Sequence, residues 1–437
     1  MPKIVVLNVG TAHALGDRSS STHPITRSGW RHAWFAEEGD VIVSPVAIDG
    51  EFLQYLGDTL GFDGHTVSVL SRDRIVTDEL LLSEDVVGEL RKRIESSGSP
   101  ASWTMMPCFH TEGTAELASL LGLASGTGTG FAAQRGSDFL NRKTHFRQLA
   151  AGIGIPLPRG SVVRSPHDLA RAVEKHLPHT GTVIVKQDDG AGGLGNLTLT
   201  TGPATALPGS RETRHVDEIT EALATEVWDA LTDRWSHGLV VESYHGASHQ
   251  FYVEYVIGDD GVPRFLDSGT IRLRPDSDPE ASELVWVGLD IPAELPPFLS
   301  AQALTLSTRL ATLVAQLGYR GHLNIDAIAT DTGEIVFNEV NARWGGGLVA
   351  HDICARLLGE RYADGHVAST VRDVQPAPLD DVLRILREHG LHFDRATQEG
   401  VLVLACDPLL GNSMECLVVG ATRDRAREIE AQLRAAL

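Results

Sequence analysis

The sequence predicts a multidomain protein of the α/β and α+β classes, and three observations support that expectation. The chain has 437 residues, more than one ordinary core holds, which suggests two to four domains of roughly 100 to 200 residues each. Its first part alternates short β-rich runs with helical patterns, as in an α/β layer around a mostly parallel sheet. Its last part, after the Pro-rich joint "VQPAPLDD", shows helix, two strands and helix. We therefore expect an α/β domain over 1–132, a mixed domain over 133–370 and a small α+β domain over 371–437.

Composition and charge exclude several classes of protein. Hydrophobic residues make up 42% and charged residues 22% of the chain, which is typical of globular proteins, and no apolar run approaches the ~18 residues of a membrane span. The start "MPKIVVLNVG" indicates a first strand rather than a signal peptide. The net charge of −21 has the wrong sign for nucleic-acid binding, and four scattered cysteines are typical of reduced thiols. We expect a cytoplasmic protein with neither a membrane nor a nucleic-acid partner.

The stretch "EIVFNEVNARWGGG", residues 334–347, combines a strand-like apolar run with polar and charged side chains. At the two-residue period of a strand, one face is expected to carry Ile335, Phe337, Glu339, Asn341 and Arg343. That face would change from apolar to charged halfway along. The three glycines that follow are expected to break the strand and allow a close approach of backbone near the substrate.

This strand is expected to form a hairpin with the preceding run, "GHLNIDAIAT", through the turn "DTGE". A tight two-residue turn at 332–333, with glycine second, is a common hairpin connection. In that register Asp326 lies directly across from Glu339, and Asn324 lies across from Asn341. The hairpin therefore brings two carboxylates face to face.

Two ionised carboxylates in that position repel each other unless a cation lies between them. Directly opposed side chains have Cβ atoms ~4.5–5.5 Å apart, and like charges there are destabilising. Mg²⁺ fits, because it takes hard oxygen ligands, usually one or two carboxylates plus phosphate oxygens and water. For a lone acidic pair, a protonated or solvent-directed carboxyl is the more common explanation. Here the neighbouring Asn341 and Arg343 favour a magnesium site formed by Asp326, Glu339 and Asn341.

A glycine-rich loop is the candidate phosphate cradle. In "VIVKQDDGAGGLGN", Lys186 ends an apolar strand, and the loop that follows contains Gly190, Gly192, Gly193 and Gly195. Such a loop can bring backbone N–H groups close to phosphates. It is not a Walker A loop, because no GK[ST] follows and the next segment is a strand. The alternative is an ordinary flexible hairpin tip. The acidic hairpin elsewhere in the chain favours the phosphate cradle over this alternative.

Two further residues are functional candidates only when they are considered together with the acidic hairpin and the glycine loop. Lys143, in the helical segment "FLNRKTHF", would alone be a solvated surface charge. Glu242 ends the strand "LVVES", where a chain crossing between domains can offer backbone groups to an adenine; a simple strand-end carboxylate is the alternative.

Together these residues resemble the ATP-grasp superfamily of carboxylate–amine ligases. The resemblance covers about 135–360 and is most specific at "NEVNAR", which is similar to the Glu-x-Asn-x-Arg signature of that family. Asp326 and Glu339 keep the family's spacing of thirteen residues. The first domain resembles the Rossmann-like pre-ATP-grasp domain. The overall layout, with its small C-terminal domain, is similar to that of the peptide ligase family of pheganomycin biosynthesis.

The resemblance implies an ATP-grasp fold and a set of roles. ATP phosphates would be held by Lys143, Lys186 and the glycine loop, within a lid at about 155–243. The adenine would lie against Glu242 and the backbone near Tyr244. Arg343 is the first choice to stabilise an acyl phosphate. The arginines of "TIRLRPD", Arg272 and Arg274, are further catalytic candidates, although surface arginines on a strand are common.

Two positions depart from the family pattern. His249 stands where many members place a glutamate on the ribose, and Asn324 stands where some place an arginine. The implied reaction is ATP- and Mg²⁺-dependent: a carboxylate donor, such as an amidino amino acid, is coupled to the amino group of a peptide or amino acid. A dipeptide ligase, a small-molecule kinase and a non-catalytic nucleotide-binding regulator are the alternatives. An exposed strand edge in the C-terminal part would allow a homodimer.

Overall fold

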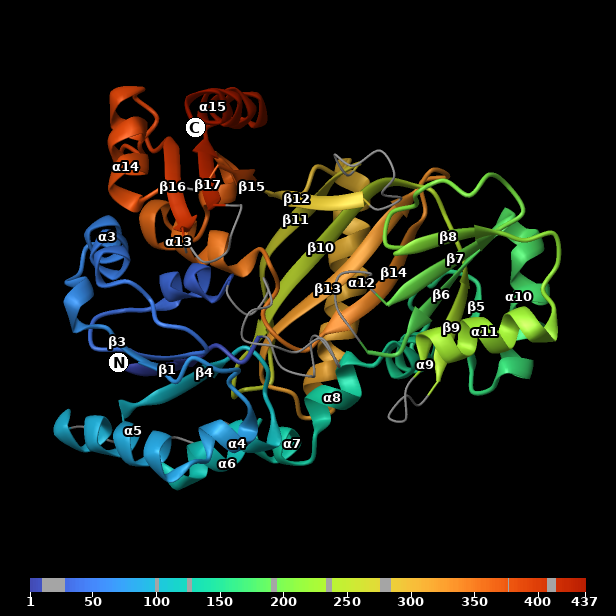
Figure 1. Cartoon of the computed structure of the whole chain (residues 1–437), viewed down its shortest axis with the longest axis horizontal. Helices are drawn as coiled ribbons and strands as arrows, with labels where there is room; N and C mark the ends of the chain where they lie inside the picture. Colours follow the sequence, from blue (N-terminus) through green and yellow to red (C-terminus); the bar gives the residue numbers. More distant parts are fainter. Residues whose placement is uncertain are drawn as a thin grey trace.

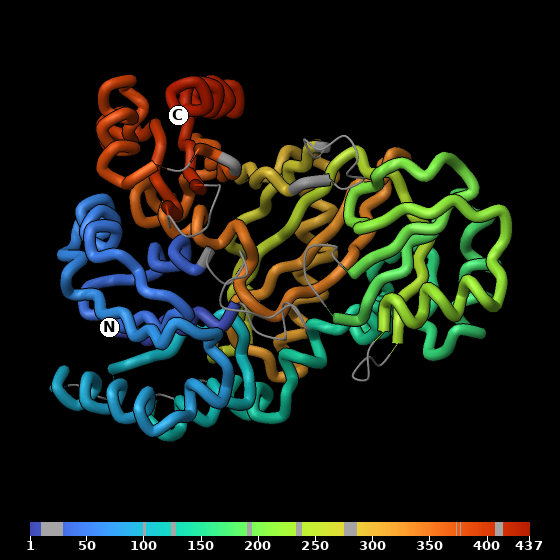
Figure 2. The backbone as a smooth tube through the Cα atoms, viewed as in Figure 1, coloured from blue at the N-terminus to red at the C-terminus, as the bar shows by residue number. Residues whose placement is uncertain are grey.

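The computed structural model describes residues 1–9, 28–98, 102–123, 128–189, 195–232, 238–275, 284–375, 377–406 and 414–437. These residues form three β-sheets with helices packed against them (Figure 1). The chain passes from a first domain through a lid at the far end, returns through a central sheet, and ends beside the first domain (Figure 2). No helix among the described residues is long and apolar enough to cross a membrane.

The first domain contains a parallel four-stranded sheet in the order β3-β2-β1-β4. Its strands are β1 (Lys3–Val6), β2 (Val41–Ser44), β3 (Ser68–Ser71) and β4 (Thr104–Pro107). Alternate residues of β1 pack on opposite faces: Val5 belongs to one buried cluster, whereas Ile4 and Val6 belong to another. Both faces are therefore covered, as expected for a parallel sheet. The covering helices are η2 (Ser28–Phe35), α3 (Gly50–Leu60), η3 (Gly64–Thr66), α4 (Asp78–Leu81), α5 (Glu84–Ser96) and α6 (Glu112–Leu120).

The lid is a separate body with its own sheet and core. The sheet has the order β5-β9-β6-β7-β8 and consists of β5 (Gly160–Val163), β6 (Thr182–Gln187), β7 (Asn196–Thr200), β8 (Glu212–His215) and β9 (Leu239–Ser243). Two amphipathic helices, α10 (Pro166–Thr180) and α11 (Glu221–Leu231), bury leucine, valine and alanine side chains against it. Three short helices connect the first domain to the lid: α7 (Thr129–Ala133), α8 (Gly136–Asn141) and α9 (Lys143–Gly152).

The central sheet has eight strands in the order β14-β13-β10-β11-β12-β15-β17-β16. They are β10 (Ala247–Ile257), β11 (Pro263–Pro275), β12 (Leu284–Ile291), β13 (Gly321–Thr330), β14 (Ile335–Asn341), β15 (Val367–Val374), β16 (Gly400–Ala405) and β17 (Met414–Gly420). Helix α12 (Pro297–Gln316) packs on one face, where Phe251, Val253 and Ile325 share a buried cluster with Leu310. The remaining helices are α13 (Leu348–Leu358), η5 (Tyr362–Asp364), α14 (Leu379–Glu388) and α15 (Arg423–Ala436).

The C-terminal part is joined to the rest of the protein in two ways. Its strands β15, β17 and β16 continue the central sheet, so the expected boundary at residue 371 falls inside β15. It also shares one hydrophobic cluster with the first domain, where Trp34 Nε1 donates to Leu404 O at 3.2 Å and Val403 N donates to Tyr55 Oη at 3.0 Å. The first and last parts of the chain therefore form one packed unit.

The strand edge that suggested a homodimer is already occupied. β16 is the last strand of the sheet and all its residues are buried. Its outer side exchanges backbone hydrogen bonds with the segment 391–393: Val401 N donates to Leu391 O at 2.7 Å, and Phe393 N donates to Val401 O at 3.1 Å. The expectation of an exposed edge there was wrong, because the chain after α14 covers it.

Candidate active site

The hairpin of β13 and β14 brings the two carboxylates face to face. Asp326 pairs with Glu339 and Asn324 pairs with Asn341, as the sequence predicted. The turn, however, differs from the expected one. Thr330 N donates to Glu334 O at 2.8 Å, so the loop has three residues, 331–333, and Gly333 takes a φ of 82°. This longer loop shifts the register by one residue at the turn end of the hairpin.

A β-bulge at Asn338 restores the register. The pairing passes from Ala327 with Phe337 to Asp326 with Glu339, which leaves Asn338 as the extra residue. A bulge of this kind reverses the side on which later side chains lie. The predicted register at the carboxylates was thus confirmed although the predicted turn was wrong.

Because of the bulge, the residues of β14 are distributed over its two faces differently from the prediction. Ile335 and Phe337 lie in the same buried cluster as Val340 and Ala342, so the apolar side changes parity at the bulge. Glu339 consequently points to the opposite face. The expectation that Ile335, Phe337 and Glu339 share one face was wrong, because the bulge lies between them. The face that Ile335 and Phe337 share with Val340 and Ala342 stays apolar along the strand.

The face opposite α12 carries a polar surface built from three neighbouring strands, which we call the polar floor. On β10, Tyr252 pairs with Asp326 and Glu254 pairs with Asn324. Together with the hairpin these residues make two rows across the sheet, namely Tyr252, Asp326, Glu339 and Glu254, Asn324, Asn341. Tyr252 also packs in the cluster shared with the first domain. The floor therefore faces the first domain.

Cations and an amide surround the carboxylate pair. Lys143 Nζ lies 3.0 Å from Glu339 Oε2. Asn341 Nδ2 donates to Asp326 Oδ2 at 3.0 Å, and Arg343 Nη2 donates to Asn341 Oδ1 at 3.0 Å. The three residues predicted to bind metal are therefore brought together with Lys143, which was predicted to contact ATP phosphates, and with Arg343, which was predicted to stabilise the acyl phosphate.

The electrostatics of the pair favour a cation. Burial and the facing Glu339 carboxylate raise the pKa of Asp326 to about 8. For Glu339, burial alone would raise the pKa, but Lys143 prevails and lowers it to about 2. The pair thus keeps a proton near neutral pH, which is the behaviour of two carboxylates that lack a full counter-charge. Two carboxylates and an amide oxygen suit Mg²⁺, which completes its shell with phosphate and water. No group of three His, Cys, Asp or Glu side chains that would hold a metal alone exists within the described ranges.

Lys143 is positioned by a residue that the sequence analysis missed. Asp188 follows β6, is 1% exposed and caps the first turn of α9. Its main-chain oxygen accepts from Lys143 N and its Oδ1 accepts from Thr144 N, both at 2.9 Å. Arg142 Nη1 lies 3.2 Å from Oδ2. The acidic pair "DD" at 188–189, which follows Gln187, was the available signal, since helix N-termini favour carboxylate caps.

Lys186 and Glu242 meet inside the lid. Lys186 Nζ lies 2.7 Å from Glu242 Oε2, and Arg147 Nη1 donates to Glu242 Oε1 at 2.6 Å. Two cations thus hold the Glu242 carboxylate, and Arg147 is a member of the cluster that the sequence did not single out. Tyr244 follows on the same strand end, where its hydroxyl donates to Pro208 O at 3.2 Å.

His249 does not share the polar floor. Alternation along β10 places it on the side of Phe251, which packs in the cluster with α12. The same alternation places Gln250 on the side of Tyr252 and therefore on the floor. Gln250 is the neighbouring polar residue that sequence reasoning missed, because an unrecognised bulge at Ser248 shifts the register by one.

The structure also separates Arg272 and Arg274 from the carboxylate pair. On β11, Asp267 and Gly269 pair with Glu254 and Tyr252 of the floor, so the arginines alternate to the other face. Arg272 Nη1 donates to Asp290 Oδ1 at 3.2 Å and Nη2 to Glu430 Oε1 at 2.8 Å. Arg272, a catalytic candidate from the sequence, therefore faces away from the carboxylate pair and connects the central sheet to α15. Arg274 is exposed.

The predicted glycine positions divide into two groups. Gly190, Gly192 and Gly193 lie outside the described residues. Gly195 is described, and its carbonyl accepts from Gln187 N at 3.1 Å to close the base of the loop. A Cβ at Gly195 would overlap the Gln187 side chain, so glycine is needed there for packing.

The glycines after Trp344 have a structural explanation. Gly345 N donates to Glu254 Oε1 at 2.8 Å, and a Cβ on Gly345 would overlap the Glu254 carboxylate. A Cβ on Gly347 would overlap the Tyr252 hydroxyl. The close backbone approach expected here therefore exists, but it is made to the floor's own side chains.

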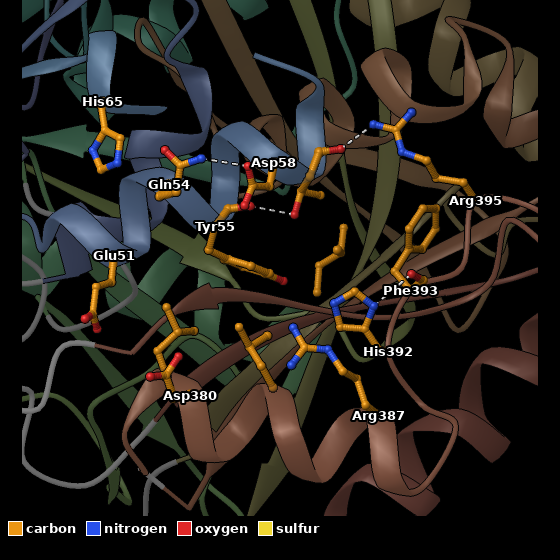
Figure 3. A pocket seen from close by; sticks show the side chains of 14 residues that line it. Glu51, Gln54, Tyr55, Asp58, His65, Asp380, Arg387, His392, Phe393 and Arg395 are labelled. Carbon is orange, nitrogen blue, oxygen red and sulfur yellow. Dashed lines mark hydrogen bonds between the residues drawn. The ribbon is translucent and has the colours of Figure 1, made fainter. Parts of the chain in front are cut away.

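One cavity of about 610 Å³ lies away from the carboxylate pair, between α3 and α14 (Figure 3). Tyr55 and Arg387 extend toward its centre, and Arg395 donates to Thr59 O at 2.6 Å across its rim. Its lining includes none of the predicted site residues. The cavity belongs to the junction of the first and last parts of the chain.

Comparisons with known proteins define the fold. A family model described as the pre-ATP-grasp domain matches residues 29–123, and one described as the PGM1 C-terminal domain matches residues 381–433. No curated protein matches the chain in sequence.

Solved structures match nearly the whole chain at low identity. An N5-carboxyaminoimidazole ribonucleotide synthetase in complex with ADP has a TM-score of 0.57 and 10% identity, covering 99% of this chain and 95% of that one. An L-amino acid ligase from Bacillus licheniformis has a TM-score of 0.53 and 14% identity, with 100% and 97% covered. A biotin carboxylase domain from Hydrogenobacter thermophilus, solved with MgADP and bicarbonate, has a TM-score of 0.57 and 13% identity, with 99% and 89% covered. The chain therefore has an ATP-grasp fold, with a pre-ATP-grasp α/β domain before it and a small C-terminal part after it.

Proposed function

We propose that this protein is an ATP-dependent, ADP-forming carboxylate–amine ligase of the cytoplasm. The observation that carries the proposal is the facing pair of Asp326 and Glu339, bordered by Lys143, Asn341 and Arg343. The arrangement combines hard oxygen ligands with fixed cations on the floor of an ATP-grasp fold. Such a set suits the transfer of a phosphoryl group, a reaction that needs mainly positioning and charge neutralisation.

Magnesium would be held by Asp326, Glu339 and Asn341. When bound, it supplies positive charge to the phosphate oxygens and removes the repulsion between the two carboxylates. The shared proton of the pair would be released on binding, because the metal favours both ionised forms. These residues fit the ion in number and in chemistry.

ATP would lie between the lid and the polar floor. Lys143 and Lys186 are the proposed phosphate ligands, and the loop from Gly190 to Gly195 is the proposed phosphate cradle. Glu242 and the backbone at Tyr244 are the proposed adenine contacts. Lys186 Nζ lies 2.7 Å from Glu242 Oε2. On binding, an ATP phosphate would replace Glu242 as a partner of Lys186. For the ribose we propose Gln250 in place of His249, since Gln250 alternates onto the floor side of β10.

The proposed reaction has two steps. A carboxylate oxygen attacks the γ-phosphorus of ATP, the bond to the bridging oxygen breaks, and ADP leaves. An amine then attacks the carbonyl carbon of the acyl phosphate, loses a proton and displaces inorganic phosphate. Arg343 is the proposed group that stabilises the charge on the acyl phosphate and on the tetrahedral species that follows.

The substrates form the finer part of the proposal. We propose an amidino or similarly unusual amino acid as donor and a peptide as acceptor, as in the ligase family of pheganomycin biosynthesis, which makes an antibiotic. The support is the layout, with a pre-ATP-grasp match at one end and a small C-terminal match at the other. A net charge of −21 suits a cationic donor. An amino-acid ligase forming dipeptides is the second candidate, favoured by the similarity in fold to the L-amino acid ligase.

The products test the reaction class. Incubation with ATP, Mg²⁺ and mixed pools of amino acids and peptides should release ADP and phosphate together with a new amide detected by mass spectrometry. Release of AMP and pyrophosphate would indicate adenylation instead. ATP binding that never leads to hydrolysis with any acid and amine would indicate a regulator.

Isotope transfer separates a ligase from a kinase. With donor acid labelled by ¹⁸O in its carboxylate, the acyl-phosphate route carries one labelled oxygen into inorganic phosphate. A small-molecule kinase would leave the phosphate on a stable product and release no labelled phosphate.

A further inference from the structure

The polar floor contains a buried carboxyl group that is neither a proposed metal ligand nor a proposed nucleotide contact. Glu254, on β10, is 0% exposed. Its Oε2 accepts from Asn324 Nδ2 at 2.8 Å, and its Oε1 accepts from Gly345 N at 2.8 Å. Burying a carboxyl group is costly unless its oxygens are hydrogen-bonded. Both oxygens of Glu254 have such a partner, and each partner leads toward the candidate metal site.

The first partner begins a continuous chain of side chains. Asn341 Nδ2 donates to Asn324 Oδ1 at 3.3 Å and to Asp326 Oδ2 at 3.0 Å. Arg343 Nη2 then donates to Asn341 Oδ1 at 3.0 Å. We call the series Glu254, Asn324, Asn341, Arg343 the polar chain.

The two ends of the polar chain determine how its amides point. Both oxygens of Glu254 accept a hydrogen bond, one from Asn324 and one from Gly345, and the guanidinium at the other end only donates. Asn324 must therefore turn its Nδ2 toward Glu254 and its Oδ1 toward Asn341. Asn341 must then present Nδ2 to Asn324 and Oδ1 to Arg343, which leaves the second lone pair of Oδ1 for a ligand.

The second partner anchors the backbone after Arg343. The contact from Gly345 N holds the start of the glycine segment against the floor. Arg343 Nη1 in turn donates to Trp344 O at 3.0 Å, within the same turn. Glu254 is thus connected to Arg343 through side chains on one route and through backbone on the other.

We infer that Glu254 is a positioning residue for the candidate metal site: through Asn324 it sets the amide orientation of Asn341, and through Gly345 it anchors the turn that carries Arg343. The inference rests on the proposed function, since it presupposes that Asn341 presents an oxygen to Mg²⁺. It also gives a reason for asparagine at position 324. Asn324 donates to Glu254 and accepts from Asn341, whereas an arginine there could only donate.

The neighbouring carboxyl group of Asp267 provides a matched control. Asp267 lies directly across from Glu254 on β11 and is 3% exposed. Its side chain faces Tyr252 and His351, with His351 Nδ1 3.3 Å from Oδ2. It is as buried as Glu254, and no bond described for its side chain leads to the polar chain.

The test measures nucleotide binding by calorimetry on the full-length protein, using ADP with Mg²⁺ and ADP with EDTA. In Glu254→Gln, an NH₂ group replaces one of the two oxygens that accept from Asn324 Nδ2 and Gly345 N. One of these donors then faces another donor. We expect the gain in ADP affinity that Mg²⁺ gives to the wild type to fall by at least ~10-fold, the order expected when a buried donor loses its hydrogen-bond acceptor. Binding of ADP in EDTA should not change. Asp267→Asn should keep the Mg²⁺-dependent gain.

A double variant tests whether the direction of the hydrogen bonds in the polar chain, rather than the size of the side chain at position 254, determines metal binding. When Glu254→Gln is combined with Asn324→Asp, the new amide at position 254 can donate to the new carboxylate at position 324, and that carboxylate can accept from Asn341. The amide of Asn341 then keeps its orientation, so the double variant should recover most of the lost Mg²⁺-dependent gain. A role in folding alone would not restore metal dependence by this exchange.

Several outcomes overturn the inference. One is an unchanged Mg²⁺-dependent gain in folded Glu254→Gln, and another is an equal loss in Asp267→Asn. A third is a double variant no better than the single one. If Glu254→Gln does not fold, Asn324→Ala cuts the same chain at its middle, and an unchanged gain there overturns the inference equally. A wild type without any Mg²⁺-dependent gain would instead contradict the proposed function.

Discussion

Lys143 Nζ lies 3.0 Å from Glu339 Oε2, which joins the first residue of α9 to the hairpin strand β14. The ammonium group lies beside the carboxylate pair, which is the proposed magnesium site. Because Asp188 of the lid caps the same helix end, the lid and the polar floor meet at this lysine. A nucleotide entering between them would contact both at once.

The carboxylate pair gives the first prediction. Glu339→Gln keeps the shape of the side chain but removes the charge that faces Asp326, so the proposed magnesium site loses one of its two carboxylates. We expect Mg²⁺-dependent turnover to fall by at least ~100-fold, the scale seen when one charge-stabilising group is removed from an active site. Steady-state release of ADP measures it, with circular dichroism to show that the fold is intact. Glu334→Gln, at an exposed position before the same strand, is the control, and equal activity in both variants would contradict the metal assignment.

The glycine segment gives a prediction about stability. A Cβ on Gly347 would overlap the Tyr252 hydroxyl, whereas a Cβ on Gly346 would lie 3.5 Å from the Trp286 ring in ordinary contact. We expect Gly347→Ala to lower the free energy of unfolding by roughly 1–3 kcal/mol, as overpacking does. Gly346→Ala should change it little. Urea unfolding of both variants measures the difference, and equal midpoints would show that Tyr252 moves aside without cost.

The pH dependence of stability gives a prediction at Asp267. Burial raises the pKa of Asp267 to about 7 from an ordinary 3.8. His351 does not supply a charge, because burial lowers its pKa to about 4, and Tyr252 is neutral. The folded state therefore keeps a proton that the unfolded state has lost. Stability is fully present below the unfolded pKa and is lost as pH rises toward 7, by at most ~1.4 kcal/mol per pH unit.

Asp267→Asn removes this titration. Its free energy of unfolding should fall less than that of the wild type between pH 4 and pH 7. Glu254, whose pKa burial and Asp267 raise to about 8, titrates in both proteins, and Asp267→Asn also removes the part of that shift that Asp267 causes. Urea unfolding at several pH values measures the two slopes. Identical slopes would mean that Asp267 is ionised in the folded protein.

The sequence predicted the arrangement of the site better than its details, and the hairpin shows why. Hydrophobic alternation and the spacing of Asp326 and Glu339 were enough to pair them. The loop length and the bulge at Asn338 were not visible, because bulges depend on how a strand twists against its partner. The longer loop and the bulge each shift the register by one residue, in opposite directions. Asp326 therefore still pairs with Glu339, whereas Phe337, between the loop and the bulge, has a shifted partner. Residue alternation alone also cannot say which face of β11 holds Arg272, because the answer depends on the order of strands in the sheet.

Arg343 and Arg272 give the last prediction, because the structure places them in different surroundings. Arg343 touches Asn341 beside the carboxylate pair, whereas Arg272 pairs with Asp290 and Glu430 on the other face. Arg343→Ala should lower turnover by roughly 100-fold or more, as loss of a charge-stabilising donor does. Arg272→Ala should leave Asp290 and Glu430 without this partner and lower the unfolding midpoint, with kcat within a few-fold of wild type because no reacting atom is near. Turnover and thermal unfolding on both variants separate the two roles, and a large loss of kcat in a well-folded Arg272→Ala would return Arg272 to the active site.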